Sequence, residues 1–301
     1  MNFEHAELST IKDYIRWGAS RFTEAKLSFG HGMASSIDEA AYLVLHTLHM
    51  PVDTPSLYFE SHLTQSERQA VAAIIQKRIE TRKPAAYLTQ EGWFCGLSFY
   101  VDERVLVPRS PIAEYVEKQF APFIEANQVH NILDLCTGSG CIGIACAYAF
   151  PHAQVDLSDI SADALAVAQI NVERHQLGQQ VELIQSDLFN NLQGRQYDLI
   201  VSNPPYVDAD DMAALSQEFR HEPELGLASG IDGLDHTRRI IKQAAAHLSE
   251  HGVLVVEVGN SQFALQAAFP DVEFYWLEFE RGGDGVFALS AQQVFALADY
   301  L

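Results

Sequence analysis

The 301-residue sequence is poor in basic residues, and this shortage limits the partners that the protein can have. It contains 19 Lys and Arg residues against 40 Asp and Glu residues, so its formal net charge is −21. Proteins that bind nucleic acid rely mainly on Lys and Arg to neutralise phosphates. The charge therefore argues against a nucleic-acid substrate. It would attract a basic protein, although an acidic surface can also serve solubility alone.

Cysteine is scarce as well, and its pattern indicates neither a metal site nor a disulfide framework. The chain has four cysteines and no Cys-x-x-Cys pair, and Cys136, Cys141 and Cys146 lie in a strand, a glycine loop and a buried helix. We therefore expect reduced, small, buried thiols, as in cytosolic proteins. The histidines are scattered without the spacing of zinc sites, so no metal is expected.

Long hydrophobic runs are missing too. The first residues, MNFEHAELSTIKDY, are polar and acidic, and no apolar stretch approaches the ~18 residues of a membrane span. The sequence thus predicts neither a signal peptide nor a membrane helix, and we expect a cytoplasmic location. Hydrophobic residues still make up 48% of the chain, which is typical of a globular protein and not of a disordered one.

The first part of the chain has a helical pattern. Within residues 1–90, apolar residues recur at three- and four-residue spacing over 11–22 and 37–48, and Ser36 is placed to cap the second helix. A Thr-x-x-Glu capping box at Thr64 predicts a third helix. Because this segment contains no catalytic constellation, we interpret it as a helical substrate-recognition domain.

The rest of the chain changes to strands and then to alternating strands and helices. Residues 91–108 predict a β-hairpin linker with its turn at Asp102-Glu103, and a helix follows over 110–123. Within the domain at 109–301, the seven expected strands are 131–135, 154–157, 181–185, 198–202, 253–258, 274–279 and 285–289. With helices between the first five strands, this pattern predicts an α/β fold with a Rossmann-like, mostly parallel sheet covered on both faces.

A glycine loop follows the first of these strands. Gly138, Gly140 and Gly143 satisfy the Gly-x-Gly-x-x-Gly spacing of dinucleotide-binding folds, which is a weak signal by itself. Glycine lets the backbone turn sharply and approach a nucleoside ligand in either case. Asp134 separates the alternatives, because a carboxylate suits the methionine ammonium of S-adenosylmethionine and not a pyrophosphate. We therefore favour an S-adenosylmethionine site over a dinucleotide site.

Two further carboxylates follow the next two strands. Asp159 is placed to accept hydrogen bonds from both ribose hydroxyls, although a dinucleotide would use it in the same way, and Ser161 is placed to cap the next helix. Asp187 offers a carboxylate to an adenine amino group, beside the apolar Leu188-Phe189. Taken alone, Asp187 could equally be an ordinary turn residue.

The strongest motif is Asn203-Pro204-Pro205-Tyr206, which follows an apolar strand at the sheet edge where ligands bind in such folds. The prolines fix the backbone, and Pro204 keeps a carbonyl acceptor. A planar amide or amine nitrogen is a poor nucleophile because its lone pair is delocalised. If the Asn203 oxygen and the Pro204 carbonyl accept its two hydrogens, the lone pair can turn toward the sulfonium methyl, while Tyr206 packs on the flat group. A chance turn is the competing interpretation.

These motifs together resemble the HemK-like protein-glutamine N(5)-methyltransferases over nearly the whole chain. Within that family, the segments 91–96, 219–229 and 280–287 are most similar to the branch that methylates ribosomal protein uL3. Release-factor enzymes usually read Pro-Arg-Pro-Glu/Asp-Thr-Glu where this chain has Pro-Arg-Ser-Pro-Ile-Ala-Glu at 108–114. The resemblance implies a class I methyltransferase fold and methyl transfer from S-adenosylmethionine to a glutamine amide nitrogen of uL3, a basic ribosomal protein.

The resemblance also implies roles for individual residues. Carried over by position, the cofactor-binding residues are Asp134, Gly138, Gly140, Asp159, Asp187 and Asn203. Residues 203–206 would hold the glutamine amide, with Asn203, Pro204 and Tyr206 as the catalytic residues. Glu222 is either a further contact to the substrate or a surface carboxylate, and Arg109 either supports the site or forms a structural salt bridge.

Three alternatives to the uL3 enzyme remain at this point. A release-factor enzyme and a nucleic-acid amino-methyltransferase use the same tetrapeptide, but the acidic charge argues against the second. A non-catalytic ribosome-assembly module would be expected to have a damaged glycine loop or a damaged Asn-Pro-Pro-Tyr motif. Both motifs are intact in this chain.

Overall fold

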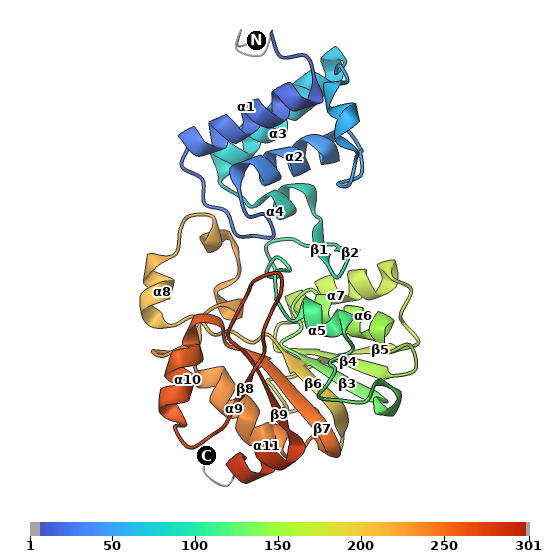
Figure 1. Ribbon diagram of the computed structural model, residues 1–301, viewed down its shortest axis with the longest axis vertical. Coiled ribbons are helices and arrows are strands. Elements are labelled where there is room, and N and C mark those ends of the chain that lie inside the picture. The colour runs from blue at the N-terminus through green and yellow to red at the C-terminus, as the bar shows by residue number, and fades with distance from the viewer. Residues whose placement is uncertain (1–6, 299–301) are drawn as a thin grey trace. The chain divides into compact units, whose positions relative to one another are not determined.

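A computed structural model describes residues 7–298, which divide into two units, each with its own hydrophobic core (Figure 1). The helical unit extends to Glu91 and also includes the later segment Ser216–His221. The second unit begins at Gly92 and contains Gly92–Leu215 and the chain from Glu222 onward. The chain therefore returns once to the helical unit, and nothing in the sequence pattern marks that return.

Four α-helices form the described part of the helical unit: α1 (Ile11–Glu24), α2 (Ser36–Thr47), α3 (Gln65–Thr81) and α4 (Ala85–Thr89). The capping box at Thr64 is confirmed, since Thr64 and Glu67 exchange both hydrogen bonds. The expected cap of α2 is wrong by one residue. Ser36 is already helical, and the extended backbone of Ser35 brings its side chain to the N–H of Asp38 instead.

Buried charges hold the return segment within the helical unit. Arg78 is fully buried and donates to Glu39 over 2.6 Å. Glu218, from the return segment, lies 2.7 Å from Arg82 and is also buried. Beside it, the Phe219 ring packs against His31 with centroids 4.1 Å apart. Ser216–His221 is thus fixed to the helices by ionic and aromatic contacts.

A two-stranded hairpin opens the second unit, with β1 (Gly92–Phe94) antiparallel to β2 (Leu97–Phe99). The expected turn at Asp102-Glu103 is wrong, because the chain reverses at Cys95-Gly96. Both turn residues have positive φ, 49° and 72°, which is the geometry of a tight two-residue hairpin turn and is easiest at glycine.

The main sheet of the second unit has seven strands in the order β5-β4-β3-β6-β7-β9-β8, which confirms the expected fold class (Figure 1). The strands are β3 (Asn131–Leu135), β4 (Gln154–Asp159), β5 (Val181–Gln185), β6 (Tyr197–Ser202), β7 (Leu248–Glu257), β8 (Tyr275–Trp276) and β9 (Val286–Ser290). Strands β3 to β7 pair in parallel, whereas β9 is antiparallel to both of its neighbours.

Helices cover both faces of this sheet. The helices of the second unit are α5 (Ala113–Glu117), α6 (Cys141–Ala149), α7 (Ala162–Arg174), α8 (Ala209–Ala214), α9 (Asp235–Ala244), α10 (Gln262–Ala268) and α11 (Ala291–Ala298). Of these, α8 has no buried residue and does not cover the sheet. Leu133 and Leu135 share a core with α9 and α11, whereas Leu157, on the other face, packs against α6. None of the helices within residues 7–298 is long and apolar enough to span a membrane.

Three expectations about local structure need correction. The helix expected over 110–123 is limited to α5, and the described chain between β5 and β6 contains turns and no helix. The four cysteines are all free, but only Cys141 and Cys146 are buried, while Cys95 and Cys136 are half-buried.

Short 3-10 turns lie at Ser56–Glu60, Ala126–Gln128, Phe219–His221, Glu224–Gly226 and Gly259–Ser261.

Candidate active site

The parallel register brings the predicted site residues to one edge of the sheet. Asp134 on β3 is paired with Leu157 on β4 and with Val201 on β6, so the carboxyl ends of these three strands coincide. Asp159 ends β4, and Asn203 directly follows β6. Ligands of doubly wound folds bind at this edge. The structure therefore collects at one place residues that are up to about seventy positions apart in the sequence.

Asp134 is a buried carboxylate with one oxygen left for a ligand. Its Oδ2 accepts hydrogen bonds from the Thr137 hydroxyl (2.5 Å) and from the N–H of Gly143 (2.8 Å). Its Oδ1 is equally buried and has no hydrogen-bond partner among the described residues. Burial raises the pKa of the Asp134 carboxyl to about 7. A buried, unpartnered carboxylate oxygen is costly, and a cationic donor such as an ammonium group fits it.

The glycine loop leaves room beside this carboxylate. At Gly143, a Cβ atom would overlap the Leu157 side chain and lie 2.9 Å from the Cβ of Asp134, so the start of α6 approaches the sheet more closely than a side chain permits. At Gly138, φ is +56° and a Cβ atom would meet none of the described residues within 4 Å. The loop is therefore tight against the sheet on one side and open at Gly138.

Asp159 fixes the same loop. Its two carboxylate oxygens accept hydrogen bonds from the N–H groups of Gly138 and Ser161, each over 2.9 Å. Burial raises its pKa. A carboxylate offers about four acceptor positions, so two remain for ribose hydroxyls. Ser161 caps α7 as expected, since its hydroxyl accepts from the N–H of Ala164.

Asp187 begins a turn after β5 and is ion-paired there. Arg239 of α9 donates one nitrogen to both of its oxygens, over 2.8 and 2.9 Å. The Asn190 side chain donates to Oδ2 as well, over 3.5 Å, so about one of the four acceptor positions of the carboxylate remains. The expectation that Leu188 and Phe189 lie beside an adenine ring is not met. Both side chains are buried in the core, and Phe189 stacks on His247, so little of their surface is left for an adenine ring.

Two consecutive prolines restrict the backbone of the Asn-Pro-Pro-Tyr corner. Pro204 and Pro205 are buried, Asn203 is half-buried, and the Asn203 side chain makes no hydrogen bond within residues 7–298. The carbonyl of Tyr206 accepts from the Ser261 hydroxyl over 2.9 Å. The side-chain amide of Asn203 is therefore available to a ligand, while Ser261 holds the backbone of the corner at Tyr206.

Tyr206 is connected by hydrogen bonds to Glu257 and Ser110, two residues that the sequence analysis did not single out. Its hydroxyl donates to Glu257 Oε1 over 3.1 Å, and the Ser110 hydroxyl donates to Glu257 Oε2 over 2.5 Å. Glu257 is the last residue of β7 and is buried, which raises its pKa to about 7. The one sequence signal was an acidic residue inside the apolar run 253–258.

Arg109 and Glu222 are partners. The guanidinium of Arg109 binds both oxygens of Glu222, over 2.5 and 2.7 Å, and the N–H of Val107 donates to the same carboxylate over 3.1 Å. The Glu222 side chain is fully buried, so it is not a surface carboxylate. The pair joins the segment after the hairpin to the residue at which the chain re-enters the second unit.

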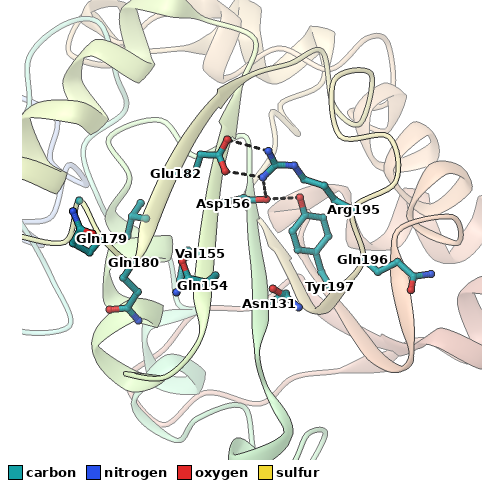
Figure 2. A pocket seen from close by; sticks show the side chains of 12 residues that line it. Asn131, Gln154, Val155, Asp156, Gln179, Gln180, Glu182, Arg195, Gln196 and Tyr197 are labelled. Carbon is teal, nitrogen blue, oxygen red and sulfur yellow. Dashed lines mark hydrogen bonds and ion pairs between the residues drawn. The ribbon is translucent and has the colours of Figure 1, made fainter.

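A separate hollow of about 620 Å³ lies at the opposite edge of the sheet, at the amino ends of β3 to β6 (Figure 2). Its charged groups are already paired: Arg195 contacts Asp156 over 2.7 Å and Glu182 over 2.9 Å, and the Tyr197 hydroxyl donates to Asp156. None of the predicted site residues lines it. The candidate active site is therefore the carboxyl edge.

Three features together define a class I methyltransferase. They are the strand order with an antiparallel β9, the buried carboxylate beside a glycine loop, and the Asn-Pro-Pro-Tyr corner.

Residues 118–232 match the model of the methyltransferase small domain family. The chain is 51% identical to the ribosomal protein uL3 glutamine methyltransferase of Neisseria gonorrhoeae, with 96% of each chain covered. It is 52% identical to that of Xanthomonas campestris pv. campestris, over 96% of this chain and 94% of that one. The chain therefore belongs to the family of ribosomal protein uL3 glutamine methyltransferases.

A solved structure supports the fold alone. The catalytic domain of hMettl16, in complex with the MAT2A 3'UTR hairpin 6, is similar with a TM-score of 0.51 over 76% of this chain and 82% of that one. Its sequence identity to this chain is 16%. Such a likeness bears on the arrangement of helices and strands and not on the acceptor.

Proposed function

We propose that this protein transfers the methyl group of S-adenosylmethionine to the side-chain amide nitrogen of a glutamine in ribosomal protein uL3. The products are N(5)-methylglutamine and S-adenosylhomocysteine. The observation that carries the proposal is the position of Asn203 and Asp134 at the carboxyl ends of the neighbouring strands β6 and β3, where Asp134 pairs with Val201, two residues before Asn203. This arrangement places an amide-binding corner at the same edge of the sheet as a carboxylate suited to an ammonium group, and the family membership supports the same reaction.

S-adenosylmethionine supplies an electrophilic methyl group on its sulfonium sulfur. In the proposal, Asp134 holds the ammonium through its unpartnered Oδ1, and Asp159 holds the ribose hydroxyls through its remaining acceptor positions. Asp187 accepts from the adenine amino group while Arg239 holds its carboxylate. Gly138 keeps a side chain out of the open space at the loop, and Gly140, with φ of +82°, lets the loop turn where a Cβ atom would press on Leu157.

The acceptor amide is bound by atoms that are already in place. The side-chain oxygen of Asn203 and the carbonyl of Pro204 accept its two hydrogens, and the ring of Tyr206 packs on its flat face. The amide lone pair then faces the methyl group. The nitrogen–methyl bond forms as the sulfur–methyl bond breaks and its electron pair stays on sulfur, and the nitrogen loses one proton to solvent. Alignment of this kind contributes roughly 7–11 kcal/mol to catalysis.

The proposed partner is a protein and not a nucleic acid. A formal net charge of −21 favours encounter with a basic ribosomal protein and opposes a phosphate backbone. The helical unit, which has no cofactor motif, is proposed to recognise this substrate, either free or during ribosome assembly, in the cytoplasm.

The test is incubation with methyl-labelled S-adenosylmethionine and three separate acceptors: isolated uL3, a release factor and DNA. We expect label on uL3. Label on DNA, or on none of the three, would overturn the proposal, and label on the release factor alone would transfer the assignment to that substrate. Asn203→Ala is expected to abolish transfer and retain cofactor binding, whereas Asn127→Ala, at an exposed turn, is the matched control.

A further inference from the structure

Glu257 is an unusual residue to find at the end of a core strand. Its neighbours on β7, Val255 and Val256, and the following Val258 are fully buried and apolar. Glu257 is only 5% exposed. Its carboxylate is satisfied by the two hydroxyls of Ser110 and Tyr206.

Arg109 is the cation whose charge acts on Glu257. Arg109 is close enough to lower the pKa of Glu257, but its guanidinium is bound to both oxygens of Glu222. Burying a carboxylate with neutral donors alone costs more than burying an apolar side chain of similar size. The fold would therefore be more stable with an apolar residue at position 257. Buried ionisable residues of this kind are concentrated at functional sites.

The sheet places Glu257 next to the acceptor corner. The last register pair of β6 and β7 is Ser202 with Val256, so the next residue on each strand is Asn203 and Glu257. From this position Glu257 holds the hydroxyl of Tyr206, whose carbonyl is held by Ser261.

Gly259 closes the remaining side of the Tyr206 ring. A Cβ atom at Gly259 would lie 2.6 Å from Cε2 of Tyr206, so the ring rests directly on the backbone of the segment after β7. The hydroxyl, the carbonyl and one side of the ring are thus all fixed from within the protein. The hydroxyl is occupied by Glu257, which leaves the aromatic surface for the substrate.

We propose that Glu257, supported by Ser110, is a positioning residue for the acceptor amide. It fixes the orientation of the Tyr206 ring and so sets the plane in which the glutamine amide lies between Asn203 and the methyl group. This inference rests on the proposed function. It predicts that removing the carboxylate lowers turnover of the protein substrate without weakening cofactor binding, because none of the Asp134, Asp159 and Asp187 carboxylates depends on Glu257.

The central comparison uses Glu257→Leu and Glu257→Gln, each assayed for kcat, for KM with uL3 and for Kd with S-adenosylmethionine. Glu257→Leu is expected to lower kcat/KM by about 10- to 100-fold, because misplacement of a reacting group by 1 Å can cost about 100-fold. Glu257→Gln keeps an oxygen for the Tyr206 hydroxyl and should retain most of the activity. The Kd for S-adenosylmethionine should stay within about twofold in both variants.

A double-mutant cycle with Tyr206→Phe tests whether Glu257 acts through the hydroxyl. If it does, adding Glu257→Leu to Tyr206→Phe produces little further loss, because the contact is already absent. Should the two losses in kcat/KM simply multiply, the proposal fails. Ser110→Ala, which removes the other donor to Glu257, serves as a milder variant if Glu257→Leu does not fold.

The chain contains a matched control at the opposite edge of the sheet (Figure 2). There the Tyr197 hydroxyl donates to the buried carboxylate of Asp156 over 2.7 Å, which is the same type of hydrogen bond, although Asp156 also pairs with Arg195. Tyr197→Phe and Asp156→Asn should change the melting temperature and leave kcat/KM within about twofold. The control separates positioning of the acceptor from the general loss of a buried hydrogen bond.

The outcomes distinguish this inference from the proposed function. If the wild-type protein does not methylate uL3, the proposed function is wrong. If the wild type is active and Glu257→Leu is equally active, the function stands and the positioning role is wrong. If the Kd for S-adenosylmethionine rises in parallel with the loss of kcat/KM, Glu257 supports the whole sheet edge and the positioning role is again wrong.

Discussion

The N–H of Gly138 donates to the carboxylate of Asp159 over 2.9 Å and so ties the loop after β3 to the end of β4. The same carboxylate accepts from the N–H of Ser161 at the start of α7. One side chain therefore holds two backbone segments that border the proposed cofactor site. The loop is shaped before any ligand arrives, which lowers the entropic cost of binding.

Replacing Asp159 with Ala should weaken binding of S-adenosylmethionine by roughly 10- to 100-fold, since hydrogen bonds to a charged group contribute about 1.5–3 kcal/mol. Asp159→Asn keeps one acceptor oxygen and should show a smaller loss. Titration calorimetry measures both Kd values, with Asp163→Ala on the exposed face of α7 as the control. An unchanged Kd in Asp159→Ala would remove this residue from the site.

Asp134 should make stability and cofactor binding depend on pH in opposite directions. Burial raises its pKa from 3.8 to about 7 in the folded protein. Between these values the folded state holds a proton that the unfolded state has lost, so stability falls as the pH rises through this window. Binding of an ammonium group needs the ionised form, so affinity for S-adenosylmethionine should rise with pH up to about 7.

The measurement compares melting temperatures of the ligand-free wild type and Asp134→Asn from pH 5 to pH 8. The difference should shift in favour of the Asn variant as the pH rises, and Asp271→Asn, at an exposed site, should show no such trend. Cofactor binding by Asp134→Asn should be weak at every pH. A flat difference curve would show that Asp134 does not titrate in this range.

Gly143→Ala should disturb the fold and the site together. The new methyl group would overlap Leu157 and press on Asp134, and overpacking of this kind costs roughly 1–3 kcal/mol. Affinity for S-adenosylmethionine should fall too, because the N–H of Gly143 donates to Asp134. Gly178→Ala, where a Cβ atom meets none of the described residues within 4 Å, is the control in urea denaturation. Equal stability of the two variants would contradict the packing argument.

Arg78→Met should destabilise the helical unit. It leaves the buried Glu39 without its cation, and breaking one half of a buried ion pair typically costs about 3–5 kcal/mol. Arg21→Met removes an exposed partner of Glu24 and should cost about 0–1 kcal/mol. Chemical denaturation followed by circular dichroism compares the two. A loss for Arg78→Met no larger than for Arg21→Met would mean that Glu39 finds another partner.

Short-range features of this fold were predictable because their causes are local. The strands 131–135 and 181–185 have the observed bounds, and the cap at Thr64 depends on a residue three positions away. The predictions of a helix cap and of a hairpin turn were wrong where more than one nearby residue suited the same role. Ser35 and Ser36 could each have capped α2, and the hairpin turn fell at Cys95-Gly96, where glycine reduces the cost of positive φ.

The Asn-Pro-Pro-Tyr corner and the Asp134 loop were recognisable in the sequence because each is a contiguous segment whose residue types suit one chemistry. Their meeting was predictable too, because parallel strands of a doubly wound sheet present their carboxyl ends at one edge. The sequence alone thus determined the fold class, the likeness to a cofactor site and the acceptor motif.

Only the tertiary structure decided which distant residues support that site. Glu257 is 51 positions from Tyr206 and 147 from Ser110, and Glu222 is 113 positions from Arg109. These partners depend on the strand order, which places β7 beside β6. They depend also on the return of Ser216–His221 to the helical unit. Such choices depend on burial and ion pairing across the whole chain, and no local pattern of residues carries them.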